Sequence, residues 1–417
     1  MSAFQPPWHR FVPDPTPDPP SLLQHVGTTG RDIEQLAASR EVRMVSQGGG
    51  MLFDGTQIGT LELKNRIVRS ATAEMMADDI GVPLPQLIDT YRELARGGVG
   101  LIITGHMFVH PSGKAHPSMT GICSDDHILG LKRLADAVHA EGGAIAAQIN
   151  HGGRQVRGSL VDDPIAPSAH EAPPPRASAR EMTMDEIEIL IDAYAQASRR
   201  AKEAGFDAVQ IHAAHGYLVS QFLSPIANGR FDGWGGTFEK RTRFFRRIIA
   251  AVREQVGCDF PVFAKLGIRD ESEDGLSLDD GVAIVSELRD WGLDAVEISG
   301  GLAETGTFNI VGDIGPGENE ATFRPWAQAA SKATELPIIL VGGMRSLDVM
   351  EDVLQSGDAQ LISMCRPLIC EPDLPRRLQQ GIQTAASCVS KNRCWPGKGE
   401  IGISCKCSGV IRKATSS

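Results

Sequence analysis

The chain repeats one pattern eight times: a short apolar run, followed by a segment whose apolar residues recur every three or four positions. The short runs have the length of β-strands, and the longer segments have the spacing of amphipathic helices. Strands that alternate with helices predict an α/β fold with a parallel sheet, and eight such units predict a (β/α)8 TIM barrel. The runs lie at residues 67–70, 99–104, 144–149, 208–211, 261–266, 295–298, 337–341 and 359–364.

A doubly wound parallel sheet is the alternative fold. Such a sheet usually carries a glycine-rich turn after its first strand, and residues 67–74 contain no glycine. The helix expected at residues 183–204 begins with Thr183 and Glu186 at the spacing of a capping box. Three helices are followed by a glycine that suits a left-handed closing residue, and the next strand starts directly after it, at Gly205, Gly292 and Gly357.

Composition excludes several classes of protein. A hydrophobic fraction of 41% with 22% charged residues is typical of a globular protein with a large core. The longest apolar runs are too short to cross a membrane, and a net charge of −11 argues against nucleic-acid or anionic-membrane partners. We find no secretion signal and therefore expect a cytoplasmic protein, in which eight cysteines would be free thiols or metal ligands.

The composition changes at both ends of the chain. Residues 1–50 are rich in proline and glycine without an apolar period, which predicts a disordered extension. Residues 51–382 carry the alternating pattern and form the predicted barrel, with a proline-rich insertion at 164–175. Residues 383–417 form a tail that holds four of the eight cysteines.

Ionisable residues gather where the fourth run ends, at His212, His215 and Tyr217. Catalytic residues of (β/α)8 barrels come from the carboxyl ends of several strands, so this cluster predicts an active site. The two histidines are also potential metal ligands. However, no Asp or Glu stands among them to complete a tight set of ligands, and we predict no metal.

The other strand ends suggest a cofactor with a ring and a phosphate. Gly342 and Gly343 follow the seventh run and Arg366 follows the eighth, where barrels often bind phosphate. A tight turn and a surface cation are the plainer explanation of these residues. Gln148 has both a donor and an acceptor for a heteroaromatic edge. Lys265 lies inside an apolar run, and it would pair with Glu297, form a Schiff base or hold an electron-rich ring.

Six segments resemble the old yellow enzyme family. These proteins are FMN-dependent ene-reductases and NADH:flavin oxidoreductases on a (β/α)8 barrel, and they are related to the N-terminal barrel of 2,4-dienoyl-CoA reductase. The resemblance runs from residue 53 to about residue 380. The segments are LKNRIVRSAT (63–72), VGLIITG (99–105), AQINHGGR (147–154), IHAAHGYLVSQFLSP (211–225), ILVGG (339–343) and CRPL (365–368).

The resemblance implies roles for the clustered residues. His212 and His215 match the pair that holds the carbonyl oxygen of the substrate, and Tyr217 matches the tyrosine that donates a proton to the α-carbon. Gln148 would contact the flavin pyrimidine, and Lys265 replaces the usual arginine beside flavin N1 and O2. The other implied flavin contacts are Ser70, Ala71, Thr72 and Gly105 around the ring, and Gly301, Gly342, Gly343, Cys365 and Arg366 at the phosphate.

Several positions depart from the family pattern, among them Ala71, where proline is common. Ala73 stands where many members have a Cys or Thr that tunes the flavin potential, and Cys365 replaces a common glycine. The tail resembles a segment that binds a [4Fe–4S] cluster in the dienoyl-CoA reductase branch, but Lys391 takes the place of one ligand cysteine. The sequence also ends before the FAD and NAD(P) domains of that branch. We therefore expect a vestige of the cluster site rather than a [4Fe–4S] cluster.

The resemblance implies an FMN-dependent enzyme that moves hydride from NADH or NADPH through FMN to an activated alkene. A flavin-dependent amine or N-methyl dehydrogenase on the same barrel is the alternative, and a flavin-binding barrel without catalysis is a third hypothesis. The intact cluster of His212, His215 and Tyr217 argues against this third hypothesis. The expected partner is a small electrophilic substrate. The sequence neither predicts nor excludes a homo-oligomer.

Overall fold

Eight parallel strands close into a barrel in the computed structural model, which describes residues 50–172, 176–302 and 309–407. Consecutive strands pair with one another, and the last strand pairs with the first, so the predicted (β/α)8 barrel is confirmed. The predicted extension 1–50 lies outside the described residues, apart from Gly50. The strands are β3 (Ile67–Arg69), β4 (Leu101–Ile103), β6 (Ala144–Asn150), β9 (Ala208–Ala213), β10 (Val262–Gly267), β11 (Ala295–Ser299), β12 (Ile338–Val341) and β13 (Leu361–Met364).

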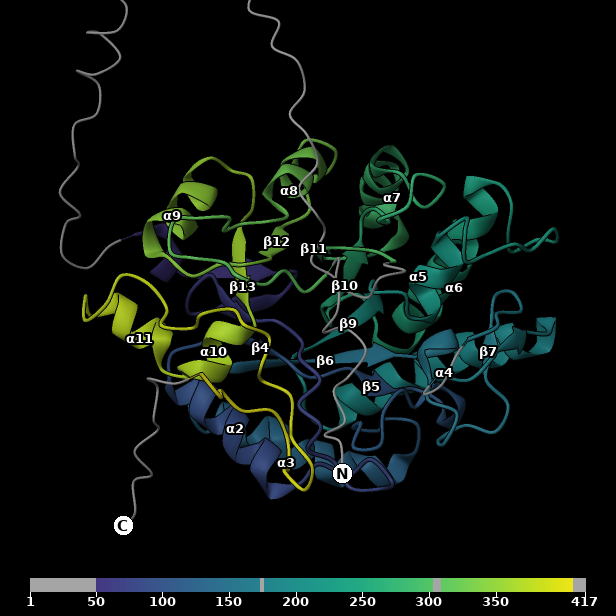
Figure 1. The fold of residues 1–417 in the computed structure, drawn as a ribbon, viewed down its shortest axis with the longest axis horizontal. Helices are drawn as coiled ribbons and strands as arrows, with labels where there is room; N and C mark the ends of the chain where they lie inside the picture. Colours follow the sequence, from purple (N-terminus) through teal and green to yellow (C-terminus); the bar gives the residue numbers. More distant parts are fainter. Residues whose placement is uncertain (1–49, 173–175, 303–308, 408–417) are drawn as a thin grey trace, which may run out of the picture. The chain divides into compact units, whose positions relative to one another are not determined.

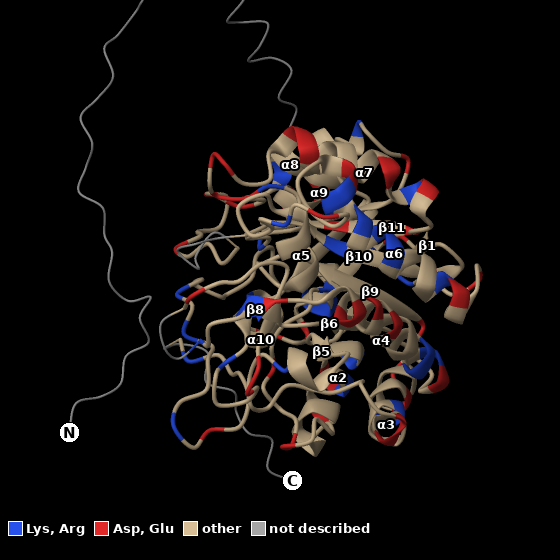
Figure 2. Cartoon of the chain, turned by 90° about the vertical axis from the view of Figure 1, so that its right-hand side faces the viewer, with Lys and Arg blue, Asp and Glu red and all other residues tan. Residues whose placement is uncertain are grey.

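Helices surround the barrel (Figure 1). Figure 2 shows that these outer helices carry both acidic and basic residues, as solvated faces do. The long ones are α2 (Pro85–Arg96), α3 (Ile128–His139), α4 (Met184–Glu203), α6 (Phe238–Val256), α7 (Leu278–Trp291), α8 (Arg324–Ser331) and α9 (Leu347–Gln355). The short ones, α5 (Leu218–Leu223), α10 (Arg366–Cys370) and α11 (Leu374–Gln379), follow β9 and β13. Among the described residues, no helix is long and apolar enough to span a membrane.

The predicted helix boundaries follow from local chemistry. The Thr183 hydroxyl accepts a hydrogen bond from the backbone N–H of Glu186, and the Glu186 carboxylate accepts one from Thr183. This reciprocal pair is the capping box expected at the start of α4. Gly292 closes α7 at a φ of 106°, a left-handed conformation that suits glycine.

A small hairpin, which the sequence pattern did not predict, closes the amino-terminal end of the barrel. Its strands are β1 (Thr56–Ile58) and β2 (Leu61–Leu63). Ile58 and Leu63 pack against side chains inside the barrel, among them Phe263, and are almost fully buried. This apolar plug leaves the carboxyl ends of the strands as the end where polar side chains can gather.

Short elements build the long connections around the barrel. Strand β5 (Met107–Phe108) extends the sheet beside β6, and β7 (Ile165–Ala166) pairs with β8 (Arg180–Glu181). The short 3-10 helices of the described residues are η2 (Met51–Phe53), η3 (Pro111–Gly113), η4 (Asp125–His127) and η5 (Gly153–Gln155). Strand β7 lies in the proline-rich insertion at 164–175, and β8 follows the insertion in the chain.

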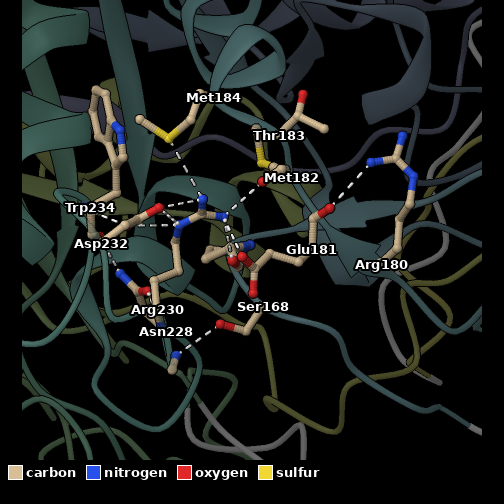
Figure 3. Close-up of polar contacts among 12 residues, drawn as sticks. Ser168, Arg180, Glu181, Met182, Thr183, Met184, Asn228, Arg230, Asp232 and Trp234 are labelled. Atoms are coloured by element: carbon tan, nitrogen blue, oxygen red, sulfur yellow. Dashed lines mark hydrogen bonds and ion pairs between the residues drawn. The ribbon is translucent and has the colours of Figure 1, made fainter.

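Arg230 clamps this insertion to the loop that follows α5 (Figure 3). Its guanidinium donates to the backbone oxygens of Pro167 and Met182, 2.9 and 2.8 Å away. It also forms an ion pair with Asp232 at 2.6 Å and contacts Glu181 at 3.4 Å. Arg230 is only 5% exposed, so these partners replace the water that its charge loses on folding.

Candidate active site

A cavity of about 340 Å³ opens at the carboxyl ends of the barrel strands. Its volume is in the range of small-molecule sites. The predicted site residues that line it are Ser70, Ala71, Thr72, Gln148, His212, His215, Tyr217, Lys265, Gly301, Gly342, Gly343, Cys365 and Arg366.

Gly105, the remaining predicted site residue, is not among the lining residues. Its backbone N–H donates to the Tyr91 hydroxyl at 2.9 Å. A Cβ at Gly105 would collide with the Glu74 carboxylate and with Thr72 O. Burial raises the pKa of Glu74 to about 7, although Arg69 lies 3.6 Å away. Gly105 therefore supports the wall behind Thr72 in this structure.

A buried network of charged and polar groups forms the floor of the cavity. Lys265 Nζ donates to Ser70 Oγ at 2.7 Å and lies 3.2 Å from Glu297 Oε1. The Glu297 carboxylate, fully buried, also accepts hydrogen bonds from Ser70, Ser363 and Gln210. A buried ion pair is tolerated when its remaining hydrogen-bonding positions are satisfied. Of the three roles considered for Lys265, the structure shows the ion pair.

The same network holds Gln148. Its side-chain N–H donates to Gln210 Oε1 at 2.6 Å, and Gln210 donates in turn to Glu297 at 2.8 Å. These two hydrogen bonds orient the Gln148 amide. Its N–H is used by Gln210, and its oxygen remains as an acceptor in the cavity wall. Parallel pairing of β6 with β9 places Gln148 directly beside Gln210, so the arrangement follows from strand register.

The two predicted histidines lie together above this floor. The His212 and His215 rings are 5.0 Å apart between centroids, and His215 Nε2 lies 2.8 Å from Ser299 Oγ. His215 has a φ of 62°, an uncommon conformation for a non-glycine residue that is often found at functional sites. Burial lowers the pKa of both rings well below the usual value, and neighbouring positive groups lower it further. Both histidines are therefore neutral near pH 7, and each has one N–H to donate.

Tyr217 completes this side of the cavity. Its ring lies 4.8 Å from the His212 ring, and burial raises the pKa of its phenol to about 12. The hydroxyl therefore stays protonated. His106 also lines the cavity, with its ring 4.9 Å from that of Tyr217 and its Nδ1 2.8 Å from Asn150 Nδ2. We did not predict His106 as a site residue, although it follows the second apolar run directly after Gly105.

The opposite side of the cavity presents glycines and an arginine. Gly342 and Gly343 have φ values of 121° and 76°, which only glycine adopts without strain. A Cβ at Gly301 would collide with Asp270. Arg366 begins α10, and its guanidinium donates to Asn392 Oδ1 at 2.6 Å. Backbone N–H groups at such glycines, with one arginine, form a suitable set of donors for a phosphate.

The tail forms part of the cavity wall, which we did not predict from the sequence. Ser390, Asn392, Cys394, Trp395 and Ile403 all line the cavity. The backbone N–H of Ile403 donates to Glu74 O at 3.1 Å. This bond fixes the tail against the loop that follows β3. The predicted boundary at residue 382 therefore separates two segments that build one site.

Cysteines lie close together where the tail meets α10. Cys370 Sγ and Cys405 Sγ are 3.3 Å apart, and Cys365 Sγ lies 3.1 Å from Thr72 Oγ1. In the described ranges, no group of three or more His, Cys, Asp or Glu side chains is arranged to hold a metal ion. The expectation of a vestigial cluster segment stays a prediction.

The fold and the cavity define a (β/α)8-barrel protein whose site lies at the carboxyl ends of its strands. The chain belongs to the NADH:flavin oxidoreductase / NADH oxidase family, whose model matches residues 51–385. The resemblance to old yellow enzymes is therefore confirmed. The match extends three residues beyond the predicted end of the barrel at residue 382 and leaves most of the tail outside it.

Relatives and solved structures agree with this assignment. The chain is 35% identical to an NADH oxidase from Thermoanaerobacter brockii over 82% of its own length and 52% of that protein. It is 34% identical to an NADPH dehydrogenase from Bacillus subtilis, with 80% of this chain and 95% of that protein covered. A solved old yellow enzyme homologue from Zymomonas mobilis superposes with a TM-score of 0.71 at 30% identity, covering 81% of this chain and 95% of that one. The chain spans about half the length of the NADH oxidase.

Proposed function

We propose that the protein is an FMN-dependent oxidoreductase that reduces an activated alkene, such as an α,β-unsaturated carbonyl compound, with NADH or NADPH as hydride donor. The observation that carries this proposal is the pair of neutral histidines beside a protonated tyrosine in one cavity. Relatives named NADH oxidase and NADPH dehydrogenase support the choice of hydride donors.

The residues present fit a flavin. Gly342 and Gly343 pack so closely against Phe323 and Ile314 that a Cβ would collide at either position, so their backbone N–H groups carry no side chain that could shield them from a phosphate. Gln148 offers a fixed amide, and Lys265 offers a cation anchored to Glu297. These residues, with Arg366 at the phosphate, would hold the cofactor. When bound, the flavin supplies hydride transfer from a nicotinamide to an electrophile.

The histidines would hold the substrate by its carbonyl oxygen. An N–H donor aimed at that oxygen stabilises the negative charge that develops there when hydride reaches the β-carbon. Ser299 bonds one ring nitrogen of His215 and so fixes the ring orientation. Neutral rings are suited to this role because each keeps an N–H without a repelling positive charge toward Lys265.

Tyr217 would donate the proton that the α-carbon requires. A phenol with a pKa of about 12 is protonated at every physiological pH, so it is always ready to donate. The Tyr217→Phe variant should lower the rate of alkene reduction by about 100-fold. Its flavin should still be reduced by NADPH at the normal rate, because that step needs no proton from Tyr217.

The spectrum of the purified protein tests the proposal. We expect a yellow protein whose flavin absorbance is bleached by NADH or NADPH without oxygen, and is restored by cyclohexenone. A colourless protein that takes up no added FMN would refute the flavin assignment. Bleaching by sarcosine or another N-methyl amine, with no recovery on adding cyclohexenone, would instead favour the amine dehydrogenase. One relative, from Chromohalobacter salexigens, is named an N,N-dimethylglycine/sarcosine dehydrogenase.

A further inference from the structure

Two arginines stand together at the edge of the cavity. Arg176 lines the cavity that also contains His212 and Tyr217. An isolated antiparallel bridge pairs Arg176 with Arg157, and both residues are exposed. Residues opposite each other in such a bridge have Cβ atoms about 5 Å apart. Two guanidinium groups therefore start from neighbouring positions on the long connection between β6 and α4.

The charges of these arginines are not balanced within the described part of the chain. Neither Arg157 nor Arg176 forms an ion pair or side-chain hydrogen bond there, whereas nearby Arg180 pairs with both Asp163 and Glu186. Like charges opposite each other in a bridge repel and destabilise it. An anion between the two guanidinium groups would remove this repulsion.

Arg176 lines the cavity beside Tyr217, and Arg157 lies next to it across the bridge. Their charges lower the pKa of Tyr217 and partly oppose the effect of burial. Burial lowers the pKa of His116 well below its usual value, and the charge of Arg157 lowers it further; the His116 ring lies 5.3 Å from the ring of His106 in the cavity wall. His116 is 9% exposed, and neither of its ring nitrogens has a hydrogen-bond partner among the described residues. A polar region thus continues from Tyr217 toward the two arginines.

We propose that Arg157 and Arg176 bind a carboxylate on the substrate, whose reacting carbonyl is held by His212 and His215. Guanidinium groups bind carboxylates through paired, charge-assisted hydrogen bonds. The substrate class is therefore an activated alkene that carries an acid group away from the reacting bond. This inference rests on the proposed function, because it places the acid relative to the histidines.

Calorimetric titration of the flavin-loaded protein tests this inference without requiring turnover. The probes are 4-hydroxybenzoate and its methyl ester, two phenols of similar shape that differ in charge. We expect tighter binding of the acid by the wild-type protein. The double variant Arg157→Gln/Arg176→Gln should weaken binding of the acid by about tenfold and leave binding of the ester unchanged. Arg133→Gln is the control for a positive charge lost elsewhere on the surface, because Arg133 is exposed on α3; it removes one charge, and the double variant removes two.

Three results would overturn the inference: equal affinity of the wild-type protein for acid and ester, equal weakening of both probes in the double variant, or the same loss in Arg133→Gln. A slower reduction of the flavin by NADPH, with unchanged binding of the acid, would assign the arginines to the hydride donor and also overturn it. Failure of the proposed function is distinguishable, because cyclohexenone would then not be reduced while titration could still show a preference for the acid.

Discussion

Buried neutral histidines are the main feature of the site at the scale of single residues. Burial lowers the pKa of His106 to about 4 and that of His151 to about 3, and it lowers the pKa of His212 and His215 strongly as well. A neutral imidazole donates from one nitrogen and accepts at the other. The cavity therefore offers directional hydrogen bonds instead of positive charge on this side.

The histidine pair should control ligand affinity. We expect the double variant His212→Ala/His215→Ala to bind 4-hydroxybenzaldehyde more weakly by roughly 100-fold, because two hydrogen bonds to the phenolate or carbonyl oxygen are lost. The loss is measured by titration of the flavin-loaded protein. Ala substitution of His139, which is half-exposed and paired with Asp207, is the control. Unchanged affinity in the double variant would remove the histidines from the substrate site.

Buried histidines also predict how stability depends on pH. The unfolded chain binds protons at His106 below its ordinary pKa of about 6.5, whereas the folded chain resists protonation down to about 4. The contribution of His106 to the free energy of unfolding is therefore retained above pH 6.5, and it is lost as the pH falls from 6.5 toward 4. His106 alone should account for roughly 2 kcal/mol between pH 7 and pH 5. Urea unfolding at both pH values checks this, and His106→Asn should show a smaller decrease.

At the scale of elements, Arg230 joins two long connections into one unit. It donates to Pro167 O in the insertion and to Met182 O just before α4, while it pairs with Asp232 on its own loop. We expect Arg230→Ala to lower the free energy of unfolding by roughly 2–3 kcal/mol, less than for a fully buried pair because Asp232 is 37% exposed. Thermal unfolding measures the loss. Arg180→Ala, which removes exposed ion pairs, should cost much less, and equal losses would contradict the clamp.

The strands could be predicted because buried parallel strands are nearly continuous apolar runs. Residues at their carboxyl ends, such as Gln148 and Lys265, could be assigned to one cavity because a closed barrel brings those ends together. Arg176 and Asn392 could not be placed from the sequence. They reach the cavity through long connections whose paths depend on distant contacts, such as the bond from Arg366 to Asn392. The hairpin strands, three residues each, were too short to show a pattern.

At the scale of the whole molecule, the site depends on the tail as well as on the barrel. A chain that ends after Val389 would keep buried Ala386 and Cys388 but lose Asn392, the partner of Arg366. We expect this variant to fold and to bind FMN about tenfold more weakly, because Arg366 is no longer held in place. Equilibrium dialysis with FMN measures the change. A chain that ends after Cys407 is the control, and equal affinity in the two shortened chains would contradict a role for the tail.

The apolar hairpin β1–β2 has a kinetic consequence. It fills one end of the barrel with apolar side chains, and in the described part of the chain the cavity proposed for the flavin lies at the other end. On the proposed function, the nicotinamide and the electrophile both react in this cavity, and they must therefore bind there alternately. Their kinetics should follow a substituted-enzyme scheme, with parallel double-reciprocal plots, and each compound at high concentration should inhibit by occupying the form of the enzyme that awaits the other.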